Sequence, residues 1–125
     1  MFILKQLFQD IVFGIQYGKF HRETKRWKDQ TFPSRTPRSI AVHLNKEAKE
    51  LLTAVENGHC KEHIAQELAD IWFLMTDCAD VQNIDILEFA REKFYDDLLH
   101  RQWHKPDKDG VVYHVKGEKN ESNAT

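Results

Sequence analysis

The stretch QELADIWFLM, residues 66–75, is the most apolar run of the chain, yet it holds two carboxylates, Glu67 and Asp70. It lies within a helix expected over residues 61–80, which is apolar nearly all the way round between Leu68 and Ala79 and is therefore predicted to be a central helix. A carboxylate that is removed from water without a partner costs several kcal/mol or becomes protonated. Two such acids in the most apolar segment need a common explanation.

A second pair of carboxylates, Glu47 and Glu50, stands in HLNKEAKELL, residues 43–52. Residues three apart on a helix lie about 60° apart around its axis, so each pair of acids shares one side of its helix. If the two helices pack antiparallel, both pairs can face each other. Four facing carboxylates repel, and a hard divalent cation such as Mg²⁺ would turn that repulsion into binding. The spacing thus suggests a metal site built from Glu47, Glu50, Glu67 and Asp70.

Each of these residues also has a structural interpretation. A helix that mixes Glu and Lys, as NKEAKE does, is usually a solvated face with minor ion pairs. Glu67 or Asp70 can equally form a salt bridge at a helix edge. His43 is then a surface residue, and Trp27 is a packing residue.

Hydrophobic periodicity predicts an all-α chain of four helices. A connector with Trp27 and Phe32 as anchors is expected between the first two helices, because Gly18, Pro33 and Pro37 stand there among many charges. The expected helices cover residues 2–16, 39–56 with Ser39 as N-cap and Asn57-Gly58 as the stop, 61–80, and 85–102. Beyond Trp103, a turn at Asp107–Gly110 and a short extended piece are expected.

Length and charge restrict the class of protein. A chain of 125 residues predicts one domain, assigned to residues 1–115, followed by a polar tail, residues 116–125. The 18 basic and 20 acidic residues are too balanced to favour a nucleic-acid or membrane partner. Two cysteines without zinc or disulfide spacing fit a reducing cytosol. The opening MFILKQLF has neither the basic region nor the cleavage site of a signal peptide, and charges interrupt it before it reaches the length of a membrane span.

The order of the motifs adds to their individual value. Trp27 with Phe32, HLNKEAKEL, ELADIWFL, NID and the tail RxWxxPDxDGVVxH follow one another over residues 27–115. This ensemble resembles the MazG-like, all-α nucleoside triphosphate pyrophosphohydrolases, and in particular the phage and bacterial branch that acts on dATP and dGTP. The resemblance implies a MazG-like four-helix bundle that assembles into dimers or tetramers in the cytoplasm of a bacterium or of a phage-infected host.

The resemblance also implies roles for single residues. Glu47, Glu50, Glu67 and Asp70 would be ligands of Mg²⁺, for which Mn²⁺ can substitute, while water cleaves a nucleoside triphosphate to the monophosphate and pyrophosphate. Glu47 or Glu50 would act as the catalytic base, with Glu50 favoured for orienting the water. The expected substrate contacts are Lys93, Asp97, Arg101, His43 and Trp27. Asp97 stands where the family often has Asn.

Two other classes of function stay open. A non-catalytic helical interaction module would use the apolar stripes of residues 2–16 and 61–80 for a partner and would show no Mg²⁺ dependence. A dUTP or dCTP hydrolase of the same fold would keep the four acids and change only the base pocket. The sequence contains no Gly-rich phosphate loop of the P-loop type and no nucleophile and base pairing that argues for a covalent intermediate, so direct attack by water is the simplest route.

Overall fold

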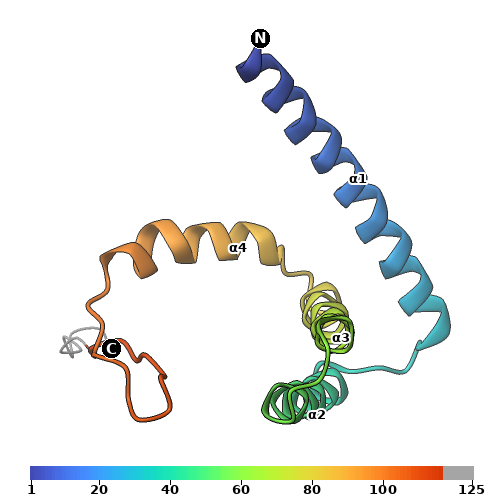
Figure 1. Cartoon of the computed structure of the whole chain (residues 1–125). Helices are drawn as coiled ribbons and strands as arrows, with labels where there is room; N and C mark the ends of the chain where they lie inside the picture. The colour runs from blue at the N-terminus through green and yellow to red at the C-terminus, as the bar shows by residue number, and fades with distance from the viewer. Residues whose placement is uncertain (117–125) are drawn as a thin grey trace, which may run out of the picture. The chain divides into compact units, whose positions relative to one another are not determined.

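The computed structural model describes residues 1–116, and within them it contains α-helices, short helical turns and no β-strand (Figure 1). The elements are α1 (Phe2–Thr31), α2 (Pro37–Glu56), α3 (Lys61–Asp80), α4 (Ile86–Glu92), the π-helical turn η1 (Lys93–Asp97) and the 3₁₀ turn η2 (Leu98–His100). The all-α prediction is confirmed. Apart from Lys116, the predicted polar tail lies outside the described residues.

The chain divides into two compact units. The first is Met1–Asp85, and the second begins at Ile86. The predicted single domain, residues 1–115, extends over both units and stays a prediction. No helix within residues 1–116 is both long enough and apolar enough to cross a lipid bilayer.

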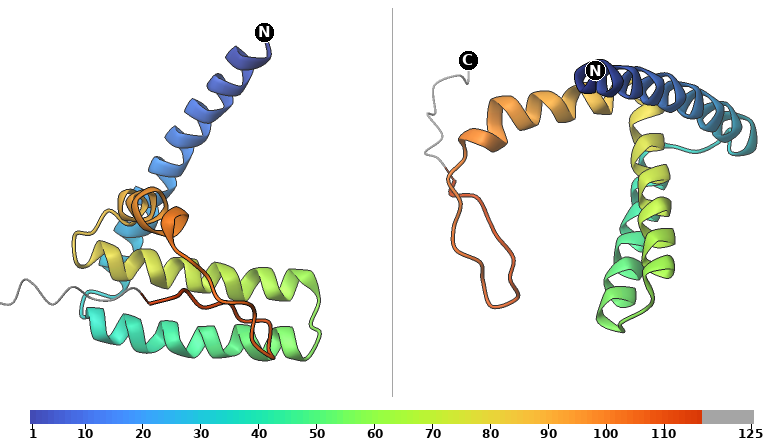
Figure 2. Two further views of the ribbon diagram at one scale, coloured as in Figure 1. Left: turned by 90° about the vertical axis from the view of Figure 1, so that its left-hand side faces the viewer. Right: turned by 45° about the horizontal axis from the view of Figure 1, so that its top comes forward.

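Helices α2 and α3 form an antiparallel hairpin, which is the main packing interaction of the first unit (Figure 2). The predicted stop after α2 is confirmed: the Asn57 N–H donates to the Thr53 carbonyl at 3.0 Å, and Gly58 follows with φ +64°. A left-handed conformation of this kind favours glycine because it has no Cβ. The predicted bounds of the third helix, residues 61–80, are also confirmed.

The predicted N-cap of the second helix was wrong by three residues. Thr36, and not Ser39, is the N-cap of α2. The Ser39 N–H donates to Thr36 Oγ1 at 3.1 Å and the Thr36 N–H donates to Ser39 Oγ at 2.9 Å, so the two residues form a capping box. Pro37 occupies the first helical position, where its missing N–H costs nothing.

The predicted end of the first helix was also wrong. Helix α1 continues through most of the expected connector and ends at Thr31, because Gly18 alone does not stop a long helix. Surface pairs four residues apart, Lys19 with Glu23 and Lys25 with Asp29, support the continuation. The helix stops only before Pro33.

The second half of α1 packs on α3 through aromatic rings. Phe20 lies against Trp72 and Phe73, with ring centroids 5.7 and 6.2 Å apart, and Tyr17 meets the edge of Trp72 at 6.3 Å. The first half of α1 extends beyond α3 (Figure 1). Its large apolar side chains, such as Phe2, are exposed.

The second unit was predicted as one helix to about residue 102. Its helical conformation instead ends at His100 and changes from α to π and then to 3₁₀ on the way. The predicted turn is confirmed, since the Gly110 N–H donates to the Asp107 carbonyl at 3.0 Å. Asp107 Oδ1 accepts two further backbone N–H groups, and Trp103 pairs with His114 across the resulting ribbon.

Candidate metal centre

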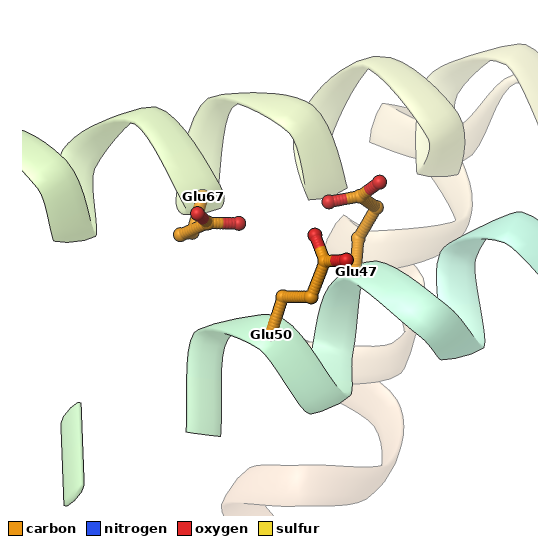
Figure 3. A group of neighbouring side chains, drawn as sticks. All are labelled: Glu47, Glu50 and Glu67. Atoms are coloured by element: carbon orange, nitrogen blue, oxygen red, sulfur yellow. The ribbon is translucent and has the colours of Figure 1, made fainter. Parts of the chain in front are cut away.

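Three of the four predicted acidic ligands converge between α2 and α3. Glu47 and Glu50 from α2 and Glu67 from α3 each offer a carboxylate oxygen, and the three oxygens lie within 4.8 Å of one another. Figure 3 shows the three side chains reaching into the same space from the two facing helices. The three-residue spacing on α2 and the antiparallel pairing of the hairpin together produce this arrangement.

The three carboxylates differ in exposure. The side chains of Glu47 and Glu67 are 11% and 15% exposed, whereas that of Glu50 is 47% exposed. One oxygen of each residue contacts a neighbour on its own helix: Glu47 Oε1 lies 2.9 Å from His43 Nε2, Glu67 Oε1 lies 3.2 Å from His63 Nε2, and Glu50 Oε1 lies 3.7 Å from Lys46 Nζ. Of these three neighbours only the exposed Lys46 carries a permanent positive charge, so the cluster is only partly neutralised.

Glu67 Oε2 is the least satisfied atom of the cluster. It is buried and has no hydrogen-bond partner among the described residues. A buried carboxylate oxygen without a partner is costly, and further acids beside it increase the cost. An all-oxygen set of this kind fits a hard divalent cation such as Mg²⁺ or Mn²⁺ and is unsuited to a metal that prefers sulfur.

Asp70 does not join the three glutamates. It is exposed on α3 and lines a cavity of about 630 Å³ together with Glu47. Asp70 stands one helical turn beyond Glu67, and its side chain is one methylene shorter. Its role as a fourth ligand stays a prediction.

Two of the predicted substrate contacts lie at the same cavity. His43 and Trp27 line it, next to Phe32, whose ring meets the Trp27 ring edge-on at a centroid distance of 5.5 Å. The remaining walls are mainly aromatic and aliphatic, including Phe20, Phe73 and Leu74. A largely apolar hollow with carboxylates at one side is the usual form of a small-ligand site.

The other predicted contacts, Lys93, Asp97 and Arg101, belong to the second unit and bind one another. Asp97 accepts from Arg101 Nε and Nη2, both at 2.6 Å, and from Lys93 Nζ. Hydrogen bonds from Arg101 and then Lys93 hold the pKa of Asp97 well below its ordinary value. Lys93 and Asp97 bound the π-helical turn, a feature that is frequent at functional sites.

The sequence interpretation missed a buried group of charges beside this cavity. Lys28 on α1 lies 3.7 Å from Asp77 and 3.6 Å from Asp80 on α3, and all three side chains are at least nine-tenths buried. Arg35 Nε donates to both oxygens of Asp77 at 2.9 Å, and His21 Nε2 lies 2.8 Å from Asp80 Oδ1. The sequence did contain one indication of this group: Asp77 and Asp80 stand three residues apart, on one side of the end of an otherwise apolar helix.

Comparison with known proteins finds similarity among solved structures. No protein-family profile and no curated protein matches the chain. Among solved structures, the cyanophage S-2L MazG-like pyrophosphohydrolase bound to dGDP and three catalytic Mn²⁺ ions per active site is similar, with a TM-score of 0.63 and 25% sequence identity. The similarity covers 80% of this chain and 93% of that one. The chain therefore has the all-α fold of the MazG-like pyrophosphohydrolases, and the predicted resemblance is supported at the level of that family.

Proposed function

We propose that the protein hydrolyses nucleoside triphosphates to the nucleoside monophosphate and pyrophosphate with the help of Mg²⁺, and that its preferred substrates are dGTP and dATP. The observation that carries the proposal is the convergence of Glu47, Glu50 and Glu67, of which Glu67 has a buried carboxylate oxygen without a hydrogen-bond partner in the described chain. The similar cyanophage protein, which is bound to dGDP and Mn²⁺, supports the same reaction class.

The three glutamates, with Asp70 as a fourth ligand, would hold the cation at the edge of the large cavity. A divalent cation bound there neutralises phosphate oxygens and lowers the pKa of an attacking water. Mn²⁺ should substitute for Mg²⁺, because both accept oxygen ligands.

Glu50 is the best placed of the glutamates to act as a base. Its side chain is about half exposed, so a water molecule can reach it, whereas Glu47 and Glu67 are mostly buried. Glu50 would orient the water and take its proton as the new bond to the α-phosphorus forms and the bond to pyrophosphate breaks.

The apolar cavity would hold the nucleoside. The rings of Trp27 and Phe32 line the cavity and can stack on a base. His43 lines the same cavity and contacts Glu47. Base stacking on aromatic rings contributes roughly 1–3 kcal/mol and tolerates any base, so these contacts bind a nucleotide without choosing it strongly. Lys93, Asp97 and Arg101 are proposed to contact the phosphates.

Pyrophosphate release from the eight common nucleoside and deoxynucleoside triphosphates, each with Mg²⁺ and with Mn²⁺, tests the proposal. We expect dGTP and dATP to give the highest rates and chelation of the metal to abolish them. Equal rates for dCTP and dGTP would remove the purine preference and leave the reaction class standing. Pyrophosphate release from none of the eight nucleotides would favour a non-catalytic helical interaction module.

A further inference from the structure

One face of α1 forms a wall of the larger cavity, which is the cavity that would hold the nucleoside. Phe20, Glu23, Thr24 and Trp27 line the cavity from this helix. They stand at positions i, i+3, i+4 and i+7, so they follow one face of α1. The carboxylate cluster belongs to α2 and α3, so this wall is separate from the proposed metal ligands.

The two ends of this face are aromatic. The Phe20 ring packs on two aromatic rings of α3, and the Trp27 ring meets the Phe32 ring edge-on. These contacts hold both rings in place. A base that packs on either ring therefore has its edge close to the two polar side chains between them, Glu23 and Thr24.

Glu23 presents a hydrogen-bond acceptor that is open to the cavity. Its side chain is 59% exposed, and Oε1 lies 3.9 Å from Lys19 Nζ, too far for a hydrogen bond. An ionised carboxylate accepts hydrogen bonds and donates none. Because the side chain is exposed and only loosely paired, it can turn toward a ligand in the cavity.

Thr24 is an acceptor too. Its hydroxyl donates to the His21 carbonyl at 3.0 Å, and this contact uses the one hydrogen of the hydroxyl. The lone pairs of the hydroxyl oxygen can only accept. The polar side chains that line the cavity from α1 therefore offer acceptors and no donor.

We infer that Glu23 and Thr24 recognise the N–H groups of a purine base; this rests on the proposed function. Adenine presents its 6-amino group, and guanine presents N1–H and its 2-amino group. These donors occupy neighbouring positions of the six-membered ring, within the range of one flexible glutamate, so the same acceptors serve dATP and dGTP. Stacking on aromatic rings tolerates any base, and the choice of a base that carries N–H groups falls to these two side chains.

A surface ion pair with Lys19 is the alternative role of Glu23, and it would give no preference among bases. Three substrates separate the two roles in the wild-type protein: dATP, dGTP and the deoxynucleoside triphosphate of unsubstituted purine. Unsubstituted purine keeps the fused rings for stacking but has no amino group and no N1–H. We expect its kcat/KM to lie below that of dATP and dGTP by about 10-fold or more, which corresponds to the loss of one hydrogen bond to a charged acceptor.

Glu23→Met tests the residue itself, because it keeps the length of the side chain and removes the acceptor. The ratio of kcat/KM for dATP to that for the purine analogue should fall to within a few-fold of one. Thr24→Val keeps the branched shape and should lower the ratio by less, since a hydroxyl is an uncharged acceptor. Lys19→Met is the matched control: it removes the same ion pair from its other side and leaves the carboxylate, so the ratio should not change.

Four results would contradict the inference. Equal kcat/KM for all three substrates in the wild type would overturn it and leave the proposed function intact. A Glu23→Met protein that is folded by circular dichroism and keeps the full preference would exclude Glu23 as the selecting group. Equal loss of the preference in Lys19→Met and Glu23→Met would assign the effect to the ion pair. Cleavage of no triphosphate at all would overturn the proposed function and this inference together.

Discussion

At the scale of single residues, the spacing of the acids along the sequence predicted three of the four positions in the carboxylate cluster, and Asp70 is the exception. The spacing of the four acids predicts that two helices present carboxylates to each other, and Glu47, Glu50 and Glu67 do converge. Spacing does not give side-chain length or rotation, and Asp70 lies exposed outside the three-residue group. Nor does it reveal that Lys28 is buried, because lysine is among the residues most often exposed.

Asp70→Asn separates metal binding from stability at this position. If Asp70 completes the metal centre, the substitution should weaken Mn²⁺ binding by at least about 10-fold, because a neutral amide is a poorer ligand. The free energy of unfolding without metal should change by no more than about 0.5 kcal/mol, since the side chain is exposed. Calorimetric titration with Mn²⁺ and metal-free urea unfolding measure the two effects, and unchanged Mn²⁺ affinity would exclude Asp70 as a ligand.

The pKa of Asp97 gives a prediction for the second unit. Hydrogen bonds from Arg101 and Lys93 lower this pKa, so the contacts should persist from neutral pH down to the ordinary range of an aspartate near pH 4. Their contribution to stability is lost only as the pH falls below that range toward the folded-state pKa, because the folded state then binds the proton less readily than the unfolded state. Carbon-detected NMR titration measures the carboxyl group directly.

Arg101→Met should raise the pKa of Asp97 toward its ordinary value, and His100→Met, at the neighbouring exposed position, serves as the control. An Asp97 pKa near 4 in the unsubstituted protein would show that these ion pairs do not form in solution.

At the scale of an element, hydrophobic periodicity predicted only the first half of α1. Residues 2–16 carry a clear apolar stripe, whereas the following half is rich in charge and contains Gly18, so it resembles a connector. Tertiary contacts hold that half in a helix: Phe20 packs on α3, and Lys28 is buried beside Asp77. In contrast, the bounds of α3 were predicted correctly, because most of that helix, from Leu68 to Ala79, is apolar nearly all the way round.

Arg35 is predicted to stabilise the junction of α1, α2 and α3. It donates to Asp77 and also to the Lys28 and Phe32 carbonyls at the end of α1, at 3.2 and 3.1 Å. Arg35→Met removes one partner of a buried ion pair and should lower the free energy of unfolding by about 3 kcal/mol. Arg38→Met, at an exposed position in the first turn of α2, should change it by less than about 0.5 kcal/mol in the same urea titration. Equal effects of both substitutions would contradict the role of Arg35.

At the scale of the whole molecule, exposed apolar surface predicts self-association. The buried hydrophobic residues within the described chain are only Ile40, Ala54 and Ala79, whereas Phe2, Ile3 and Phe8 at the start of α1 are each at least 67% exposed. Apolar surface of this extent usually marks an interface. We expect a homo-oligomer, most simply a tetramer formed from two dimers.

Light scattering at micromolar concentration measures the mass of the assembly. Phe2→Ser combined with Phe8→Ser should shift the assembly toward smaller species, and Lys5→Ser provides a matched change at a polar position of the same helix. A mass of one chain for the unsubstituted protein would contradict the prediction.

The central claim is that the carboxylates between α2 and α3 serve metal-dependent triphosphate cleavage and not stability. Glu67→Gln tests it most directly, because Glu67 Oε2 is buried beside two further acids without a partner in the described chain. Metal-free melting and dGTP turnover with Mg²⁺ are measured on the same preparation, with Glu62→Gln, at an exposed position of α3, as the control. We predict a melting temperature that is unchanged or higher and a turnover lower by on the order of 100-fold or more. A destabilised Glu67→Gln protein that still cleaves dGTP at the wild-type rate would contradict the account.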